Sequence, residues 1–112
     1  MPFINTKVNV PMSSEQELTL KTEFGKAASL IRKSENWLML DFEDNCRMYF
    51  RGDNAPAAMV QVSLYGKASS SDYEAMTRKL TELLVSVMGI PADRIYVKYD
   101  EISNWGFAGS NF

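Results

Sequence analysis

The sequence predicts an α+β domain built from duplicated β-α-β units, with a four-stranded mixed sheet and two helices on one face. Two amphipathic helical patterns each lie between two strand-like segments, and the two halves have matching lengths and helix starts. Two strands joined through a helix in one sheet run parallel. At 112 residues the chain has the length of a single domain, and we assign residues 1–112 to it.

The first strand is expected over Pro2–Val10, where β-branched and aromatic residues recur and Pro11 ends the run. A strand tolerates proline at its first residue, so Pro2 fits this position.

The first helix is expected to begin at Ser14, because its spacing to Glu17 matches a capping box. It should end near Arg32 or Lys33, where positive charge complements the C-terminal end of the helix dipole. The second strand is expected over Trp37–Phe42, whose continuous apolar run indicates burial on both faces at one end.

A polar connection over Glu43–Pro56 begins the second half and has room for a short strand at Met48–Phe50. The third strand is expected over Ala58–Tyr65 and is stopped by Gly66.

The second helix is expected to begin at Ser71, again with a glutamate three residues later at Glu74. Gly89 suits the position just beyond a helix C-terminus. The fourth strand is expected over Ile95–Tyr99, and residues 104–112 form a tail that mixes aromatic and turn-forming residues. Two helices on one face leave the other face of the sheet open, and symmetric association is the usual way to cover it.

Composition excludes several classes of function. The net charge is −2 and no run of Lys and Arg exceeds two residues, which argues against a nucleic-acid partner. The chain has no histidine and one cysteine, Cys46, so it lacks Ser-His-Asp and Cys-His nucleophile systems, and this composition argues against a zinc site. No apolar stretch reaches the ~20 residues of a membrane span, and the N-terminus has no signal-peptide pattern. We therefore expect a cytoplasmic protein without a metal or a membrane partner.

Pro2 is the candidate for chemistry, provided that Met1 is removed. Trimming would leave a secondary amine on the rigid first residue of a strand. A free α-amine has a pKa of about 7.7–8, and an apolar pocket or nearby cations would lower that pKa. Such an amine is suited to general base catalysis at neutral pH. The alternative is a Met-Pro start without catalytic meaning, and with Met1 retained the Pro2 nitrogen is an amide without useful basicity.

Several segments together resemble the macrophage migration inhibitory factor family, part of the tautomerase superfamily. The most specific are the Pro2 start, the strand end at Gly66-Lys67 and the segment Asp93–Tyr96. Lys33, four residues before Trp37, fits the same pattern, and the resemblance spans essentially the whole chain.

The resemblance implies a homotrimer with a central channel and active sites between neighbouring subunits. It also implies a keto–enol tautomerase that needs no cofactor. The substrates would be aromatic α-keto acids such as phenylpyruvate, with dopachrome derivatives as a further class. Pro2 would act as the base and then as the acid in this reaction.

Two further residues match substrate-contacting positions of the family. Lys33 matches the lysine that engages the substrate carboxylate or carbonyl oxygen, where a fixed cation stabilises the developing enolate. Without the resemblance, Lys33 would be interpreted as a solvated residue of the last helical turn. Tyr65 falls where the family usually has isoleucine. The family contact there is made by the backbone amide, so it survives the change, while the larger ring would narrow the pocket.

Five more residues match positions around the substrate. Tyr96 matches a tyrosine contributed by the adjacent subunit. Lys98 stands where the commonly described members have asparagine, and it would add a second cation near the substrate carboxylate and favour the neutral Pro2 amine; the alternative is a surface residue. Trp37, Phe107 and Phe112 match the apolar rim of the pocket, and their alternative role is core or interface packing.

Two other functions compete with this hypothesis. The first is a cytokine-like binding or signalling protein on the same fold, with a vestigial pocket. Its partner would be a host receptor if the protein is secreted without a signal peptide, as some family members are. The second is a hydrolytic dehalogenase, which needs extra arginines and a water-activating carboxylate near Pro2. The sequence does not identify those residues. Cys46 is isolated, so thiol-disulfide activity is not expected.

Overall fold

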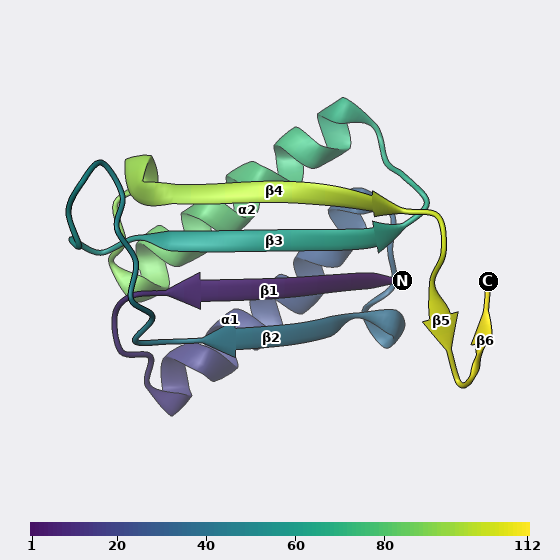
Figure 1. Ribbon diagram of the computed structural model, residues 1–112, viewed down its shortest axis with the longest axis horizontal. Helices are drawn as coiled ribbons and strands as arrows, with labels where there is room; N and C mark the ends of the chain where they lie inside the picture. Colours follow the sequence, from purple (N-terminus) through teal and green to yellow (C-terminus); the bar gives the residue numbers. More distant parts are fainter.

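The computed structural model describes residues 1–112 and contains one four-stranded sheet. Its strands are β1 (Pro2–Val8), β2 (Met39–Glu43), β3 (Ala58–Tyr65) and β4 (Ile95–Ile102). Their order across the sheet is β2-β1-β3-β4, so β1 and β3 are central and β2 and β4 form the edges (Figure 1).

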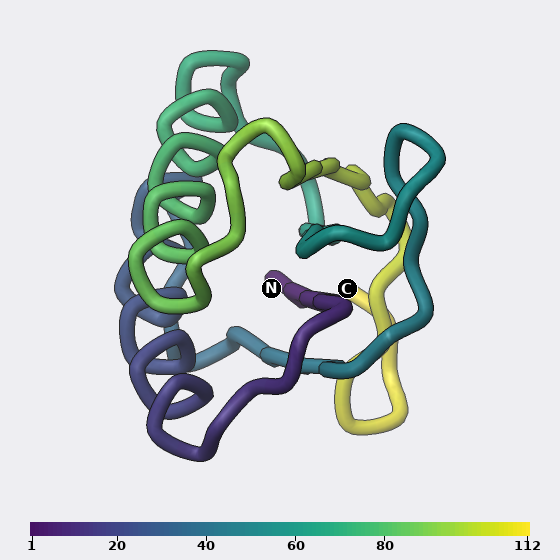
Figure 2. Tube along the Cα trace, turned by 90° about the vertical axis from the view of Figure 1, so that its left-hand side faces the viewer, coloured from purple at the N-terminus to yellow at the C-terminus, as the bar shows by residue number.

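Two helices, α1 (Ser14–Ala27) and α2 (Ser70–Met88), lie on the same face of the sheet, as Figure 2 shows. Shorter elements complete the chain: the 3₁₀ turns η1 (Ala28–Ile31), η2 (Glu35–Trp37) and η3 (Ala92–Arg94), and a C-terminal hairpin of β5 (Gly106–Phe107) and β6 (Ser110–Asn111). Neither helix combines the length and the hydropathy that a bilayer crossing requires.

Strand directions confirm the duplicated β-α-β organisation. β1 runs parallel to β2, and β3 runs parallel to β4, each pair being joined through one helix. The two units meet where β1 pairs antiparallel with β3. The sheet is therefore mixed, as the sequence predicts.

The hydrophobic core fills the space between the sheet and the helices. Every second residue of β3, from Ala58 to Leu64, is buried, as a strand with one face on a core requires. Opposite these residues lie the fully buried Leu20 and Phe24 of α1 and Leu80 and Leu84 of α2. The other face of the sheet has no helix over it (Figure 2).

Helix α1 begins at Ser14 as predicted, and α2 begins one residue before the predicted Ser71, but the capping residues of both helices lie one or two residues before the predicted serines. The cap of α1 is Ser13, whose hydroxyl accepts from the Gln16 amide at 3.1 Å, while the Gln16 side chain accepts from the Ser13 amide at 2.9 Å. In α2 the Ser69 hydroxyl accepts from the Asp72 amide at 3.1 Å. Runs of adjacent serines offer several caps of equal chemistry, so the sequence alone does not single out Ser13 or Ser69.

The connection from α1 to β2 also differs from the prediction. The α-helix ends at Ala27 and tightens into a 3₁₀ turn up to Ile31, after which Arg32 takes a left-handed conformation with φ 59°. Trp37 ends the separate η2 turn, and β2 begins only at Met39. Residues of β2 alternate between exposed and half-buried, so the predicted burial on both faces is wrong. β2 is an edge strand. The apolar run that begins at Trp37 starts in the η2 turn and continues into β2, so it is not one continuous strand.

The remaining differences are in length. Residues 48–50 form no strand, and Phe50 makes only an isolated bridge with Asp53. β4 extends to Ile102, beyond the predicted end at Tyr99. The predicted terminator Gly89 does end α2, in the left-handed conformation with φ 69°.

Replacing Ser13 by alanine should lower the free energy of unfolding by about 1 kcal/mol, because the first turn of α1 loses its side-chain acceptor. Ser14→Ala is the matched control and should leave stability nearly unchanged, because Ser14 lies within the helix. Urea denaturation followed by circular dichroism measures both. Equal losses in the two variants would contradict this assignment of the cap.

Candidate active site

Pro2 is the first residue of the central strand β1 and is buried. It lies opposite Leu64 of β3, and the next residue, Phe3, lies opposite Met39 of β2. The N-terminus is therefore held at one end of the sheet, flanked by a strand on each side. This position exists because proline, which lacks an amide proton, is accommodated at a strand start.

A largely apolar pocket of about 510 Å³ opens beside Pro2. It is walled by the start of β1, by the η2 turn with the beginning of β2, and by the C-terminal hairpin. The residues that line it are Met1, Pro2, Phe3, Asn36, Trp37, Leu38, Met39, Trp105, Gly106 and Phe107. The pocket thus joins three segments that are far apart in the sequence.

Aromatic contacts hold the C-terminal hairpin at this pocket. Trp37 and Phe107 meet edge to face with ring centroids 5.0 Å apart, and Phe107 stacks on Phe112 at 6.3 Å. Phe112 in turn contacts Tyr65 at 5.7 Å. The turn of the hairpin needs Gly109, which has φ 88°. The four aromatic residues that the sequence analysis singles out at this end of the molecule therefore form one continuous group.

Lys33 and Tyr65 meet at the same end of the sheet. The Lys33 Nζ donates to the Tyr65 carbonyl oxygen at 3.0 Å, and the Tyr65 amide donates to the Met1 carbonyl oxygen at 3.0 Å. The left-handed Arg32 turns the chain so that Lys33, which is half-buried, leaves the helix axis. Lys33 is thus not a solvated residue of a last helical turn.

The environment of the N-terminus lowers the pKa of the Met1 α-amine below its ordinary value. Burial is the larger cause, because it disfavours the charged form, and the positive charge of Lys33 is the second. Both causes favour a neutral amine at this end of the sheet.

Tyr96 and Lys98 lie in β4 and do not reach this pocket within one chain. Tyr96 pairs with Met59, which pairs with Lys7, five residues from Pro2 along β1. At about 3.3 Å per residue, Tyr96 lies roughly 17 Å away along the strand direction, with two further strand spacings across the sheet. Lys98 is two residues closer but lies on the same distant edge strand.

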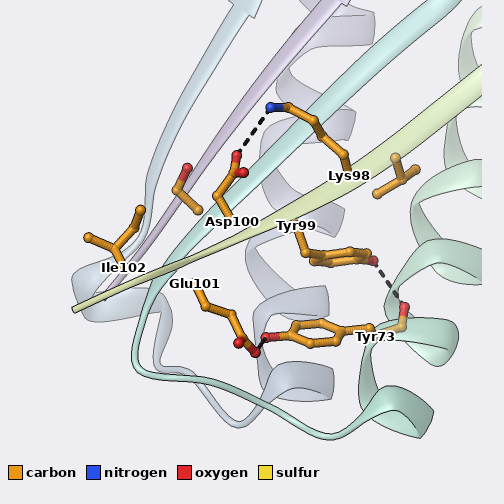
Figure 3. Close-up of a pocket in the computed structure, with 8 residues that line it drawn as sticks. Tyr73, Lys98, Tyr99, Asp100, Glu101 and Ile102 are labelled. Atoms are coloured by element: carbon orange, nitrogen blue, oxygen red, sulfur yellow. Dashed lines mark hydrogen bonds and ion pairs between the residues drawn. The ribbon is translucent and has the colours of Figure 1, made fainter.

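The two faces of β4 carry different groups, as Figure 3 shows. On the face without helices, Lys98 Nζ forms an ion pair with Asp100 Oδ2 at 3.3 Å. On the helix side, the Tyr99 hydroxyl donates to the Tyr73 carbonyl at 3.0 Å, and the Tyr73 hydroxyl donates to Glu101 at 2.6 Å. Burial raises the pKa of the Tyr99 phenol. Lys98 is therefore paired but half-exposed on the open face of the sheet.

Most of the other lining residues, Asn36 and Met39 among them, were not predicted as site residues from the sequence. The position of Met39 at the pocket follows from the parallel register of β1 with β2, once Pro2 is taken as the first residue of β1. Asn36 lies in the η2 turn and has no motif that would have singled it out. No group of three or more His, Cys, Asp or Glu side chains comes together in the chain as a metal site would need.

The duplicated β-α-β units, with a mixed sheet and two helices on one face, form the tautomerase fold. The chain belongs to the macrophage migration inhibitory factor family, whose family model, described as Macrophage migration inhibitory factor (MIF), matches residues 1–112.

Relatives of known sequence or structure match over the full chain. A macrophage migration inhibitory factor homolog from Trichuris trichiura is 26% identical and covers 100% of both chains. The crystal structure of Leishmania major MIF2 superposes with a TM-score of 0.94 at 34% identity, covering 100% of this chain and 97% of that one. A homologue from Prochlorococcus marinus has a TM-score of 0.90 at 28% identity, with 98% of each chain covered.

Replacing Lys33 by methionine should raise the pKa of the Met1 amine, because it removes the second of the two causes that lower this pKa. Lys26→Met is the matched control, because it removes one charge from the exposed Lys26 of α1. It should leave the pKa of the Met1 amine unchanged. An NMR titration of the isotopically labelled α-amine gives this pKa in the wild type and in both variants. An unchanged pKa in Lys33→Met would contradict the electrostatic role of Lys33.

Proposed function

We propose that the protein, once Met1 is removed, is a keto–enol tautomerase that needs no cofactor and uses the Pro2 amine as base and acid. The observation that carries this proposal is the position of Pro2. It is a buried chain start on a central strand, beside an apolar pocket and near a half-buried lysine. Family membership supports the same chemistry.

Removal of Met1 would change the site in two ways. It would give Pro2 a free secondary amine. It would also release the Tyr65 amide, whose acceptor is the Met1 carbonyl. A backbone donor and the Lys33 ammonium would then lie next to the new amine, where a substrate carboxylate or an enolate oxygen needs hydrogen-bond donors.

The reaction moves one proton in each of two steps. In the direction from enol to ketone, the neutral Pro2 amine accepts the enol hydroxyl proton and leaves an enolate. The positive charge of Lys33 stabilises this enolate. The protonated amine then donates its proton to C3, the carbon beside the ketone carbon, which forms the C–H bond and regenerates the neutral base.

The pocket walls support an aromatic α-keto acid as the substrate class. Trp37 and Phe107 present rings to the pocket, and Phe112 and Tyr65 extend the aromatic surface. Such walls bury an aryl group. The carboxylate of the substrate would lie toward Lys33.

The site is proposed to be shared between subunits of a homotrimer. Tyr96 is 63% exposed and Met39 is 66% exposed, although both are large apolar residues on the sheet. Association of copies through the open face and edges of the sheet would bury them. It would also bring Tyr96 and Lys98 of one subunit to the Pro2 pocket of its neighbour, which their own chain cannot do.

A second function, cytokine-like binding or signalling, is favoured by the names of the relatives, which are macrophage migration inhibitory factors. A host receptor would be the partner. The pocket could be retained in such a protein without turnover.

The trimmed wild type should convert the enol of phenylpyruvate to the ketone. Pro2→Gly should lose on the order of 100-fold in kcat/KM, because its primary amine lacks the fixed position that the proline ring gives the base, and a positioned base typically contributes at least that much. Absorbance loss of the enol measures the rate, and intact mass verifies that Met1 is absent. Lys26→Met serves as a control for a charge change away from the pocket. If wild type and Pro2→Gly are equally inactive, the enzyme hypothesis is wrong and the signalling alternative remains.

Lys98 and Asp100 should tune the affinity for the anionic substrate in opposite directions. Lys98→Asn removes the second cation and should raise KM. Asp100→Asn frees Lys98 from its ion pair and should lower KM. Each change should be up to about fivefold, the range of a solvent-exposed charge pair. Steady-state kinetics at low salt measures both, and changes of the same sign in both variants would contradict the assignment.

A further inference from the structure

Arg94 forms a buried clamp at the end of the sheet opposite the Pro2 pocket. Its side chain is only 9% exposed, and it pairs with Asp53 Oδ1 at 2.9 Å. The guanidinium also donates to the carbonyl oxygens of Pro56 at 2.9 Å and Ala55 at 3.0 Å. A buried charge persists only when its donors are satisfied, so these contacts tie the loop 50–56 to the start of β4.

The same clamp fixes Phe50. Arg94 donates to the Phe50 carbonyl at 3.3 Å, and its guanidinium carbon lies 5.3 Å from the centre of the Phe50 ring. Phe50 and Asp53 exchange two backbone hydrogen bonds, at 2.9 Å and 3.2 Å. Both the backbone and the ring of Phe50 are therefore held by neighbouring groups.

Phe50 in turn contacts Tyr96. Their rings meet edge to face, with centroids 5.0 Å apart and an interplanar angle of 89°. Aromatic pairs in this geometry are favourable beyond the area they bury. A contact chain thus runs from the buried Arg94 through Phe50 to a tyrosine that is 63% exposed.

This contact matters because an exposed tyrosine otherwise samples several rotamers. Ordering a side chain at an interface costs about 0.5–1.5 kcal/mol, and a contact that orders it beforehand removes that cost from binding. The Tyr96 ring extends from the start of β4. Its contact with the Phe50 ring reduces the ordering cost that Tyr96 would otherwise add to binding.

We propose that Arg94 and Phe50 are positioning residues that hold the Tyr96 ring ready for the Pro2 pocket of the neighbouring subunit. This inference rests on the proposed shared site. Neither residue touches substrate. Arg94 acts on Phe50, and Phe50 acts on the ring that completes the neighbour's pocket.

The first test measures the order of Tyr96 and does not depend on activity. Fluorotyrosine is incorporated, and the Tyr96 resonance is assigned with Tyr96→Phe. In Phe50→Leu this resonance should shift and its transverse relaxation should slow, because the ring gains mobility. Phe50→Tyr keeps a ring and should retain the wild-type relaxation. Unchanged relaxation in Phe50→Leu would overturn the proposal, whatever the protein catalyses.

The second test separates positioning from a merely structural role. Phe50→Leu should raise KM about 2- to 10-fold with little change in kcat, matching the ordering cost of one side chain. Phe50→Tyr should restore KM. A loss in kcat at unchanged KM, together with a lower melting temperature, would indicate a role in folding alone and would refute the proposal.

Mixed trimers show on which subunit Phe50 acts. Pro2→Gly and Phe50→Leu chains are unfolded together, refolded at equal amounts and checked for trimer mass by sedimentation. Sites that join Pro2 of one chain to Phe50 and Tyr96 of the next should show wild-type KM, at about a quarter of all sites for random assembly in a ring. If every active site in the mixture keeps the raised KM of Phe50→Leu, Phe50 acts on its own chain's pocket and the proposal is wrong. An inactive wild type would refute the proposed function, and the fluorine measurement would still decide the order of Tyr96.

Discussion

The antiparallel pairing of β1 with β3 is the constraint on which the site depends. It sets Pro2 opposite Leu64 and leads the Tyr65 amide to the Met1 carbonyl, so the chain start becomes part of the sheet. A terminus held in this way has a fixed position and lies in a partly desolvated environment, which is what a base of lowered pKa requires. Lys33 reaches the same place by binding the Tyr65 carbonyl. One strand pairing thus places the proposed base, its cation and a backbone donor together.

The one-sided architecture is the reason why the proposed site needs more than one chain. Both helices cover one face, and the edge strands leave large apolar side chains exposed on the sheet. Tyr96 and Lys98 belong to the edge strand farthest from β2, whereas the pocket lies at the start of β1, between the η2 turn and the C-terminal hairpin. An arrangement with copies side by side would resolve both facts at once, because it covers apolar surface and completes the pocket. In such an arrangement the Arg94 clamp, at the end of the sheet far from Pro2, would position Tyr96 for the pocket of the neighbouring subunit.

The order of strands and helices was predictable because its signals are local. The alternation in Ala58–Tyr65 and the terminator Gly89 both act within their own element. Helix caps were misplaced because adjacent serines at 13 and 14 are chemically equivalent, and the structure forms the capping box between Ser13 and Gln16. The candidate site was predicted mainly through the family resemblance. Contacts such as Lys33 with the Tyr65 carbonyl and Trp37 with Phe107 join segments far apart in the chain, and no spacing in the sequence encodes them.

The claim that the Pro2 amine is the catalytic base can be tested by one comparison in the trimmed protein. The pKa of the labelled Pro2 nitrogen is measured by NMR and compared with the acid limb of the pH profile of kcat/KM. A neutral amine is the active form, so the limb should coincide with a Pro2 pKa below the ordinary value of a chain terminus. Activity that persists at a pH where Pro2 is already protonated would contradict the account.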